Sequence, residues 1–246
     1  MNRISDYNVL STSIIRWLND QIDSTGSECF VVGVSGGIDS AVASTLAART
    51  GKTVYAVGMP IHQDENQKEL SEAHLDWLDT NFTNVTQLRF DLTNVFNQLC
   101  VDLREYGSDH HALANTRSRL RMTTLYQVSG KCHGLVVGTG NKVEDYGVGF
   151  YTKYGDGGVD IAPIADLYKT EVWELGKFFG VDQRIIEASP TDGLWDDGRT
   201  DEDQLGVSYT DLELAMETGT GPGVEVLERF NTMNQHKMQP IPTYKL

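Results

Sequence analysis

The sequence contains only three cysteines, Cys29, Cys100 and Cys132, which lie far apart. An odd, scattered set without a CxxC pair argues against a disulfide framework or a zinc site and is typical of reduced thiols. Long apolar runs are also lacking, since none reaches the roughly 18 residues needed to span a bilayer. The N-terminus has no basic stretch followed by a continuous apolar one, so it does not predict a secretory signal. We therefore expect a cytoplasmic protein with no membrane segment.

Basic residues are scarce, with 20 Lys and Arg against 35 Asp and Glu and a formal net charge of −15. An acidic surface repels the phosphate backbone of a long nucleic acid, so we expect no nucleic-acid partner. A small nucleotide needs only a few local cations. Such cations recur through the middle of the chain: Arg117, Arg119, Arg121, Lys142, Lys153 and Lys169. A basic site on an acidic protein indicates a small polyanionic ligand.

Low-complexity linkers and internal repeats are absent, and 246 residues suit one large domain, so we expect a single domain over 1–246. Short apolar runs predict strands at 29–34, 53–59, 85–90 and 134–139. Helical patterns alternate with them, at 9–22, 39–50, 65–82, 92–104, 113–129, 167–180, 208–217 and 222–235. This alternation predicts an α/β fold: a doubly wound parallel sheet with helices on both faces. Two segments without periodicity, 145–162 and 189–206, are predicted loops and candidate lids.

The segment GVSGGIDS, residues 33–40, joins the first predicted strand to the next helix. Adjacent glycines let several backbone N–H groups face one anion, Ser35 and Ser40 add hydroxyl donors, and the helix N-terminus adds positive charge. The segment lacks the lysine of GxxxxGK[ST] and the spacing of GxGxxG. From glycine content alone, a plain turn is an equal alternative. Asp39 has two readings, a metal ligand or a helix N-cap.

The SGGxDS pattern resembles the pyrophosphate-binding loop of the N-type ATP pyrophosphatases, which leave AMP on an acceptor and release pyrophosphate. Residues 138–144, GTGNKVE, resemble the GTxNKxE segment of NAD synthetases. Residues 149–160, GFYTKYGDGGVD, resemble their GYFTKYGDGGADI segment. Ser208-Tyr209 and His236-Lys237 also fit, so the resemblance covers about residues 10–240.

This resemblance implies an adenine nucleotide alpha hydrolase-like fold and a ligase that forms a C–N bond. The enzyme would amidate deamido-NAD (nicotinate adenine dinucleotide) with ammonia, the final step of NAD biosynthesis. The products would be NAD, AMP and pyrophosphate, formed through an adenylated carboxylate. The resemblance also implies Mg²⁺ and a homodimer. Glutamine-using members carry an N-terminal glutaminase domain; only some 30 residues precede the ATP loop here, so we expect none and favour free ammonia.

The resemblance assigns roles residue by residue. The ATP phosphates would contact Gly33, Val34, Ser35, Gly36, Gly37, Ile38, Asp39 and Ser40. Further ATP contacts would come from Met59, Thr139, Lys169 and Thr191. Mg²⁺ would be held by Asp39 and Glu144. Deamido-NAD would contact Arg119, Lys153, Asp160, His236 and Lys237, with Asn115 one helical turn before Arg119. Lys169 would neutralise phosphate charge, and we hypothesise that Asp156 holds or deprotonates ammonium.

Departures and alternatives stay open at this stage. Relatives carry an arginine after the second strand, where this chain has Val57-Gly58-Met59-Pro60, and the segment 138–157 is one residue longer. Without the resemblance, Glu144 is better interpreted as a surface acid, and Thr191 can be a turn residue. The pair His110-His111 lacks partners at ligand spacing and is predicted to lie in a loop.

The arginines at 117, 119 and 121 cannot share one helix face, so one or two of them are expected to be solvated. The terminal pair His236-Lys237 predicts that the C-terminus folds back over the site. Two rival functions are another ATP pyrophosphatase, such as a tRNA-modifying or GMP-synthesising enzyme, and an ATP sensor without turnover. The segment 149–160 argues against the first, and the paired acids Asp39 and Glu144 argue against the second.

Overall fold

The computed structural model describes residues 3–107, 109–191 and 200–245. Its described residues form a four-stranded parallel sheet in the order β3-β2-β1-β4. The strands are β1 (Cys29–Gly33), β2 (Thr53–Gly58), β3 (Val85–Arg89) and β4 (Gly134–Val137). The helices that precede or separate the strands are α1 (Tyr7–Thr25), α2 (Ile38–Arg49), α3 (Glu65–Asn81), α4 (Thr93–Asp102) and α5 (His110–Cys132). The remainder comprises η1 (Val143–Val148), α6 (Lys169–Phe179), α7 (Gln183–Glu187), α8 (Asp201–Leu205), α9 (Tyr209–Thr218) and α10 (Val224–Met238).

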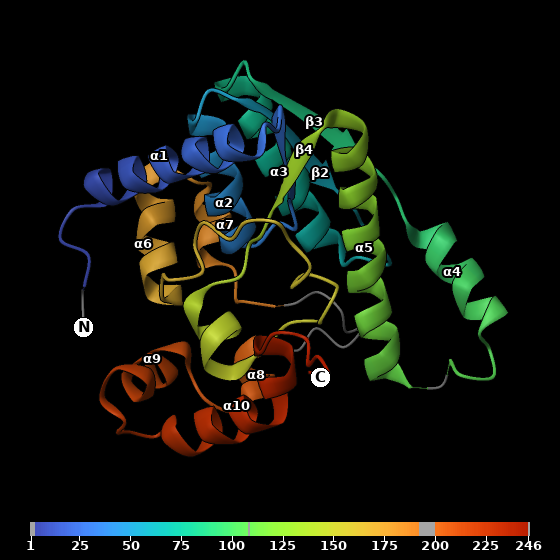
Figure 1. Cartoon of the computed structure of the whole chain (residues 1–246), viewed down its shortest axis with the longest axis vertical. Helices are drawn as coiled ribbons and strands as arrows, with labels where there is room; N and C mark the ends of the chain where they lie inside the picture. The colour runs from blue at the N-terminus through green and yellow to red at the C-terminus, as the bar shows by residue number, and fades with distance from the viewer. Residues whose placement is uncertain (1–2, 108, 192–199, 246) are drawn as a thin grey trace.

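Helices cover both faces of the sheet. The central strand β1 has apolar side chains on both faces, and both are buried against helices. Phe30 and Val32 belong to a large core shared with α1, α2 and α6. Cys29 and Val31 belong to a second cluster on the opposite face, against α5. Figure 1 shows α2 and α6 on one side of the sheet and α5 on the other. The predicted doubly wound α/β fold is therefore confirmed.

The strand order reverses its direction beside β1. The chain moves from β1 to β2 and β3 on one side, and then returns to add β4 on the other side of β1. Ligands of open α/β sheets bind at the carboxyl ends of strands where the order reverses in this way. Residues 33–40 follow β1 and residues 138–144 follow β4, so the two motifs meet at this point.

Several local expectations were wrong. Part of the predicted loop 145–162 is the π-helix η1, whose single wide turn has no 3.6-residue period to detect. The predicted loop 189–206 ends in α8, a five-residue helix too short for a periodic signal. His110 and His111 form the first turn of α5, capped by Asp109, rather than a loop. Residues 192–199, which carry half of the acids of the run 192–203 in the second candidate lid, lie outside the described residues.

Within the described part of the chain, no helix is both long and apolar enough to cross a bilayer.

A buried histidine makes the fold sensitive to acid. His74 of α3 is 1 % exposed, contacts the Ser44 hydroxyl at 2.9 Å through Nε2 and stacks on Trp77. Burial lowers the pKa of His74 from 6.5 to about 4, although a hydrogen bond with Ala41 opposes the shift. The unfolded chain therefore takes up a proton below pH 6.5, while the folded chain resists until about pH 4, so unfolding becomes easier as the pH falls.

We expect acidification from pH 7.5 to 5 to remove about 2 kcal/mol of stability through this residue. His74→Gln keeps a polar group beside Ser44 but does not titrate, so its stability should fall less over the same range. Urea unfolding of both proteins at the two pH values measures the difference. Equal losses in the two proteins would show that acid acts elsewhere.

Candidate active site

The loop after β1 is shaped to present backbone N–H groups. Gly36 has a φ of 93°, the Ser35 hydroxyl accepts from the Gly37 N–H at 3.2 Å, and the Ser40 hydroxyl accepts from the Ser35 N–H at 3.1 Å. The first intrahelical bond of α2 runs from Ala41 N–H to the Gly37 carbonyl, so the preceding amides point out of the helix start. Such an arrangement favours an anion.

Asp39 does not cap this helix. The N-cap position is Gly37, which makes no side-chain cap, and Asp39 lies in the first turn with its carboxylate turned toward another part of the chain. The N-cap alternative for Asp39 is therefore wrong.

Three charged side chains from distant segments meet next to the loop. Lys169, the first residue of α6, places its Nζ 2.5 Å from Asp39 Oδ2 and 3.0 Å from Glu144 Oε1. The Lys169 side chain is 3 % exposed and the Glu144 side chain 15 %, so reading Glu144 as a surface acid is wrong. Burial alone would lower the pKa of Lys169, but Asp39 and Glu144 outweigh it and raise that pKa above its ordinary value. Lys169 is therefore a fixed cation.

The two carboxylates suit a magnesium ion shared with phosphate. Mg²⁺ is commonly held by one or two carboxylates together with substrate phosphate oxygens. Asn141 orients both acids: its Nδ2 donates to Asp39 Oδ1 at 3.3 Å and its Oδ1 accepts from the Glu144 N–H at 3.2 Å. In the described residues no third His, Cys, Asp or Glu completes a closed metal cluster. Such an open donor set is consistent with the predicted ion, which would take its other ligands from ATP and water.

The loop after η1 is anchored to α5. Asp156 Oδ1 accepts from the Ser118 hydroxyl at 2.6 Å and from the Thr152 N–H at 3.0 Å. The Thr152 hydroxyl donates to Asn115 Oδ1 at 2.6 Å. The Asp156 side chain is exposed, and these two hydrogen bonds hold its carboxylate in one orientation. Thr152 thus contacts both Asn115 and Asp156, and Ser118 is a further partner of Asp156.

The end of α10 lies across this loop. Lys237 Nζ donates to the carbonyls of Gly149 at 2.9 Å and Tyr151 at 2.8 Å, and Lys153 Nζ donates to the carbonyl of His236 at 2.8 Å. These contacts confirm that the C-terminal segment folds back. In this structure the ammonium groups of both lysines donate to backbone carbonyls.

The three arginines of α5 have different surroundings. Arg117 is buried over the Phe96 ring, and Arg119 is exposed with long 3.3 Å contacts to the Lys153 carbonyl. Arg121 donates to the Met59 carbonyl at 3.0 Å and to Gln63 at 2.8 Å. The expectation that a solvated arginine would be among the three is met by Arg119. Sequence reasoning missed that Arg121 reaches the segment after β2, in which this chain lacks the arginine that the resemblance implies.

Asp160 fixes the segment beside β4. It accepts from the Tyr126 hydroxyl at 2.9 Å and from the Val136 N–H at 2.8 Å. Thr139 follows β4 and is half-buried, and Thr191 is exposed. The ATP contacts predicted for Met59, Thr139 and Thr191 stay predictions.

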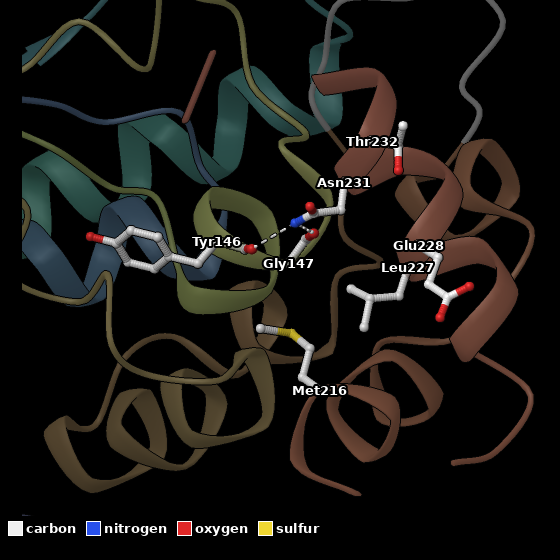
Figure 2. A pocket seen from close by; sticks show the side chains of 7 residues that line it. All are labelled: Tyr146, Gly147, Met216, Leu227, Glu228, Asn231 and Thr232. Atoms are coloured by element: carbon white, nitrogen blue, oxygen red, sulfur yellow. Dashed lines mark hydrogen bonds between the residues drawn. The ribbon is translucent and has the colours of Figure 1, made fainter. Parts of the chain in front are cut away.

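A hollow of about 490 Å³ lies away from these groups, between η1, α9 and α10 (Figure 2). Asn231 Nδ2 spans one wall by donating to the carbonyls of Tyr146 and Gly147. The lining contains none of the predicted site residues: Tyr146, Gly147, Met216, Leu227, Glu228, Asn231 and Thr232. The positive charge needed to bind a polyanion is instead Lys169, beside the loop after β1, so we place the chemistry there.

Comparison with known proteins agrees with this placement. The family model described as NAD synthase matches residues 10–242. An NH(3)-dependent NAD(+) synthetase of Carboxydothermus hydrogenoformans is 35 % identical over 230 residues, which cover 91 % of this chain and 92 % of the relative. The structure of an NMN synthetase from Francisella tularensis superposes with a TM-score of 0.90 at 30 % identity and covers 99 % of this chain and 100 % of that one. An NH3-dependent NAD synthetase from Campylobacter jejuni, in complex with the nitrate ion, shares the fold with a TM-score of 0.80 at 24 % identity, covering 98 % and 100 %.

Proposed function

Since this chain belongs to the NAD synthase family, we propose that it uses ATP to join ammonia to the nicotinate carboxylate of deamido-NAD, giving NAD, AMP and pyrophosphate. The family assignment makes it an ATP-dependent ligase of NAD biosynthesis. The observation that carries the finer proposal is the meeting of Asp39, Glu144 and Lys169 beside an anion-binding loop. The names of the curated relatives support ammonia as the nitrogen donor. We also propose a single synthetase domain over 1–246 that works as a homodimer.

In the first step the nicotinate carboxylate attacks the α-phosphorus of ATP, and pyrophosphate leaves with the bond electrons. A carboxylate is a poor acyl donor, and the attached AMP gives it a good leaving group. The N–H groups at the start of α2 and the Lys169 ammonium stabilise the negative charge that spreads over the phosphates. Asp39 and Glu144 would hold Mg²⁺, which neutralises phosphate charge when bound.

In the second step ammonia attacks the adenylated carbonyl, the C–N bond forms and AMP leaves. Ammonium must lose a proton before it can attack, and the nitrogen loses another as the amide forms. Asp156 is the acceptor we propose, since the Ser118 hydroxyl and the Thr152 N–H hold its carboxylate in one orientation. The protein otherwise positions two nucleotides against each other, so no side-chain nucleophile is needed.

Replacing Asp156 with asparagine should slow the amidation step about tenfold, because ammonia can also lose its proton to water and the residue supplies only part of the usual acid–base effect. The neutral variant keeps an acceptor for the Ser118 hydroxyl, so the loop should keep its fold. Single-turnover conversion of preformed adenylate measures the rate, and thermal unfolding checks that the variant is folded. An unchanged amidation rate at low ammonium would remove the proposed role.

A second candidate substrate is nicotinate mononucleotide, the acid that corresponds to NMN. Two observations favour it: the similarity to the Francisella tularensis NMN synthetase, and the use of Lys153 and Lys237 on backbone carbonyls. Both lysines are implied contacts of the dinucleotide, and in this structure their ammonium groups already have partners.

Chromatography of the reaction products separates the candidates. The purified protein is mixed with ATP, Mg²⁺ and ammonium chloride, with either deamido-NAD or nicotinate mononucleotide as acceptor, and with glutamine replacing ammonium in parallel. We expect NAD and AMP in equal amounts, and kcat/KM at least tenfold higher for deamido-NAD. A higher kcat/KM for the mononucleotide would make NMN the product. Absence of amide from both acceptors would overturn the proposed function.

A further inference from the structure

Tyr209 is a buried residue that the resemblance gives no role, and its hydroxyl reaches the proposed metal site. It is the first residue of α9 and 1 % exposed. The Tyr209 Oη donates to Glu144 Oε1 at 2.7 Å and lies 3.2 Å from Asp201 Oδ2. A phenol hydroxyl has one hydrogen to donate, and the contact with Glu144 is the shorter of the two, so Glu144 is its main acceptor.

The two donors to Glu144 meet on one oxygen. Lys169 Nζ at 3.0 Å and Tyr209 Oη at 2.7 Å both contact Oε1. With Oε1 held in this way, the rotation of the carboxylate is fixed and the other oxygen, Oε2, is the one offered to a cation. A hydrogen-bonded partner that orients a metal ligand in this manner commonly determines how well the metal binds.

The ring of Tyr209 is itself held rigidly. Lys169 Nζ lies 4.9 Å from the ring centroid, and the Trp173 ring packs edge-on at 6.2 Å. The backbone N–H of Tyr209 donates to Glu202 Oε1 at 3.0 Å, which ties α9 to α8. The hydroxyl therefore has little freedom to leave Glu144, and the start of α8 is linked to the site through the same side chain.

We propose that Tyr209 is a positioning residue that acts through Glu144: its hydroxyl holds Oε1 and so fixes the orientation in which the carboxylate would bind the metal ion. This inference rests on the proposed function, because it takes Glu144 as a metal ligand. Tyr209 touches neither substrate nor metal in this scheme, so its removal should weaken metal binding without abolishing ATP binding.

Direct metal binding tests the proposal without turnover. Mn²⁺ serves as the probe, with α,β-methylene-ATP, and free Mn²⁺ is counted by electron paramagnetic resonance. Tyr209→Phe should weaken Mn²⁺ binding about tenfold. The matched control is Tyr168→Phe, which removes a hydroxyl from another buried tyrosine of the same apolar cluster and should leave Mn²⁺ binding unchanged. Binding of the analogue without metal should be the same in all three proteins.

A double variant shows whether Tyr209 acts through Glu144. In a Glu144→Gln background, adding Tyr209→Phe should change Mn²⁺ binding less than twofold, because the positioned ligand is already lost. Thermal unfolding identifies any variant that is not folded, and the Glu144→Gln pair then decides the point. Equal Mn²⁺ binding by the wild type and a folded Tyr209→Phe variant would overturn this inference and leave the proposed function standing. A wild type that binds no Mn²⁺ with the analogue would overturn the proposed metal site and the function built on it.

Discussion

Lys169→Met is expected to lower kcat/KM for ATP at least a thousandfold, the largest effect we predict for one side chain. Lys169 is the cation that lies between Asp39 and Glu144, and its side chain is 3 % exposed. Methionine fills a similar space but leaves two carboxylates facing each other and the incoming phosphates without a fixed positive charge. Loss of a preorganised charge in a site of this kind costs about 3–4 kcal/mol in the transition state, and the added repulsion of phosphate raises that figure.

The folded state should also suffer, since removing one partner of a buried ion pair costs about 3–5 kcal/mol, and the partial exposure of both acids places this case near the lower bound. Steady-state kinetics and urea unfolding measure the two effects. Lys177→Met on the same helix is the control, because it breaks only an exposed pair with Glu174 and should change neither quantity appreciably. Activity of Lys169→Met within tenfold of wild type would mean that the phosphates are neutralised by other groups.

Gly36→Ala should destroy the phosphate loop more thoroughly than any other glycine substitution in that loop. Gly36 has a φ of 93°, and a Cβ there would lie 2.6 Å from the Gln67 carbonyl and 2.9 Å from the Ser71 nitrogen, both backbone atoms of α3. The clash cannot be relieved by turning a side chain. Backbone strain and overpacking together should lower stability by about 4 kcal/mol, roughly a 10 °C fall in melting temperature for a chain of this size.

Two other glycines separate the causes. Gly51→Ala places alanine at a φ of 76° with nothing within 4 Å, so it measures backbone strain alone. Gly37→Ala adds only an ordinary 3.5 Å contact with the Ser35 hydroxyl, so it tests a small change in the loop without the clash. Calorimetry should show the largest loss of stability for Gly36→Ala, a smaller one for Gly51→Ala and the smallest for Gly37→Ala. ATP titration should show that Gly36→Ala lowers the affinity for ATP a hundredfold or more. A Gly36 variant as stable as the Gly51 variant would show that α3 moves aside.

The strands and long helices could be predicted because apolar runs and helical periods are local. The strand 29–34 and the helix 65–82 are each within a residue or two of β1 and α3. Helices of five or six residues are too short to show a helical period, and α7, α8 and η1 were missed for that reason. For Asp39 the sequence predicted two alternative roles, a metal ligand or a helix N-cap. The structure excludes the N-cap role, because Gly37 occupies the N-cap position of α2.

The part of the site formed by one continuous motif could be predicted from the sequence. The contacts between distant segments could not. The loop 33–40 is continuous, so its composition describes it. The bridge from Lys169 to Asp39 joins residues 130 positions apart, and the bond from Tyr209 to Glu144 joins residues 65 apart. No spacing rule connects such pairs. Asn115 was found through helical spacing from Arg119, and the same reasoning, moved three residues along the helix, would have indicated Ser118.

The wide turn η1 has an evolutionary consequence. A π-turn holds one residue more than an α-turn between similar end points, so a chain can gain a residue there by insertion and keep both flanks in place. Glu144 lies at one flank, fixed by Asn141, and Gly149 lies at the other with a φ of 64° under Lys237. The additional residue that the resemblance implies in 138–157 would fit between these two anchored ends. Length variation at this point can drift among descendants without disturbing the carboxylate on one side or the C-terminal contact on the other.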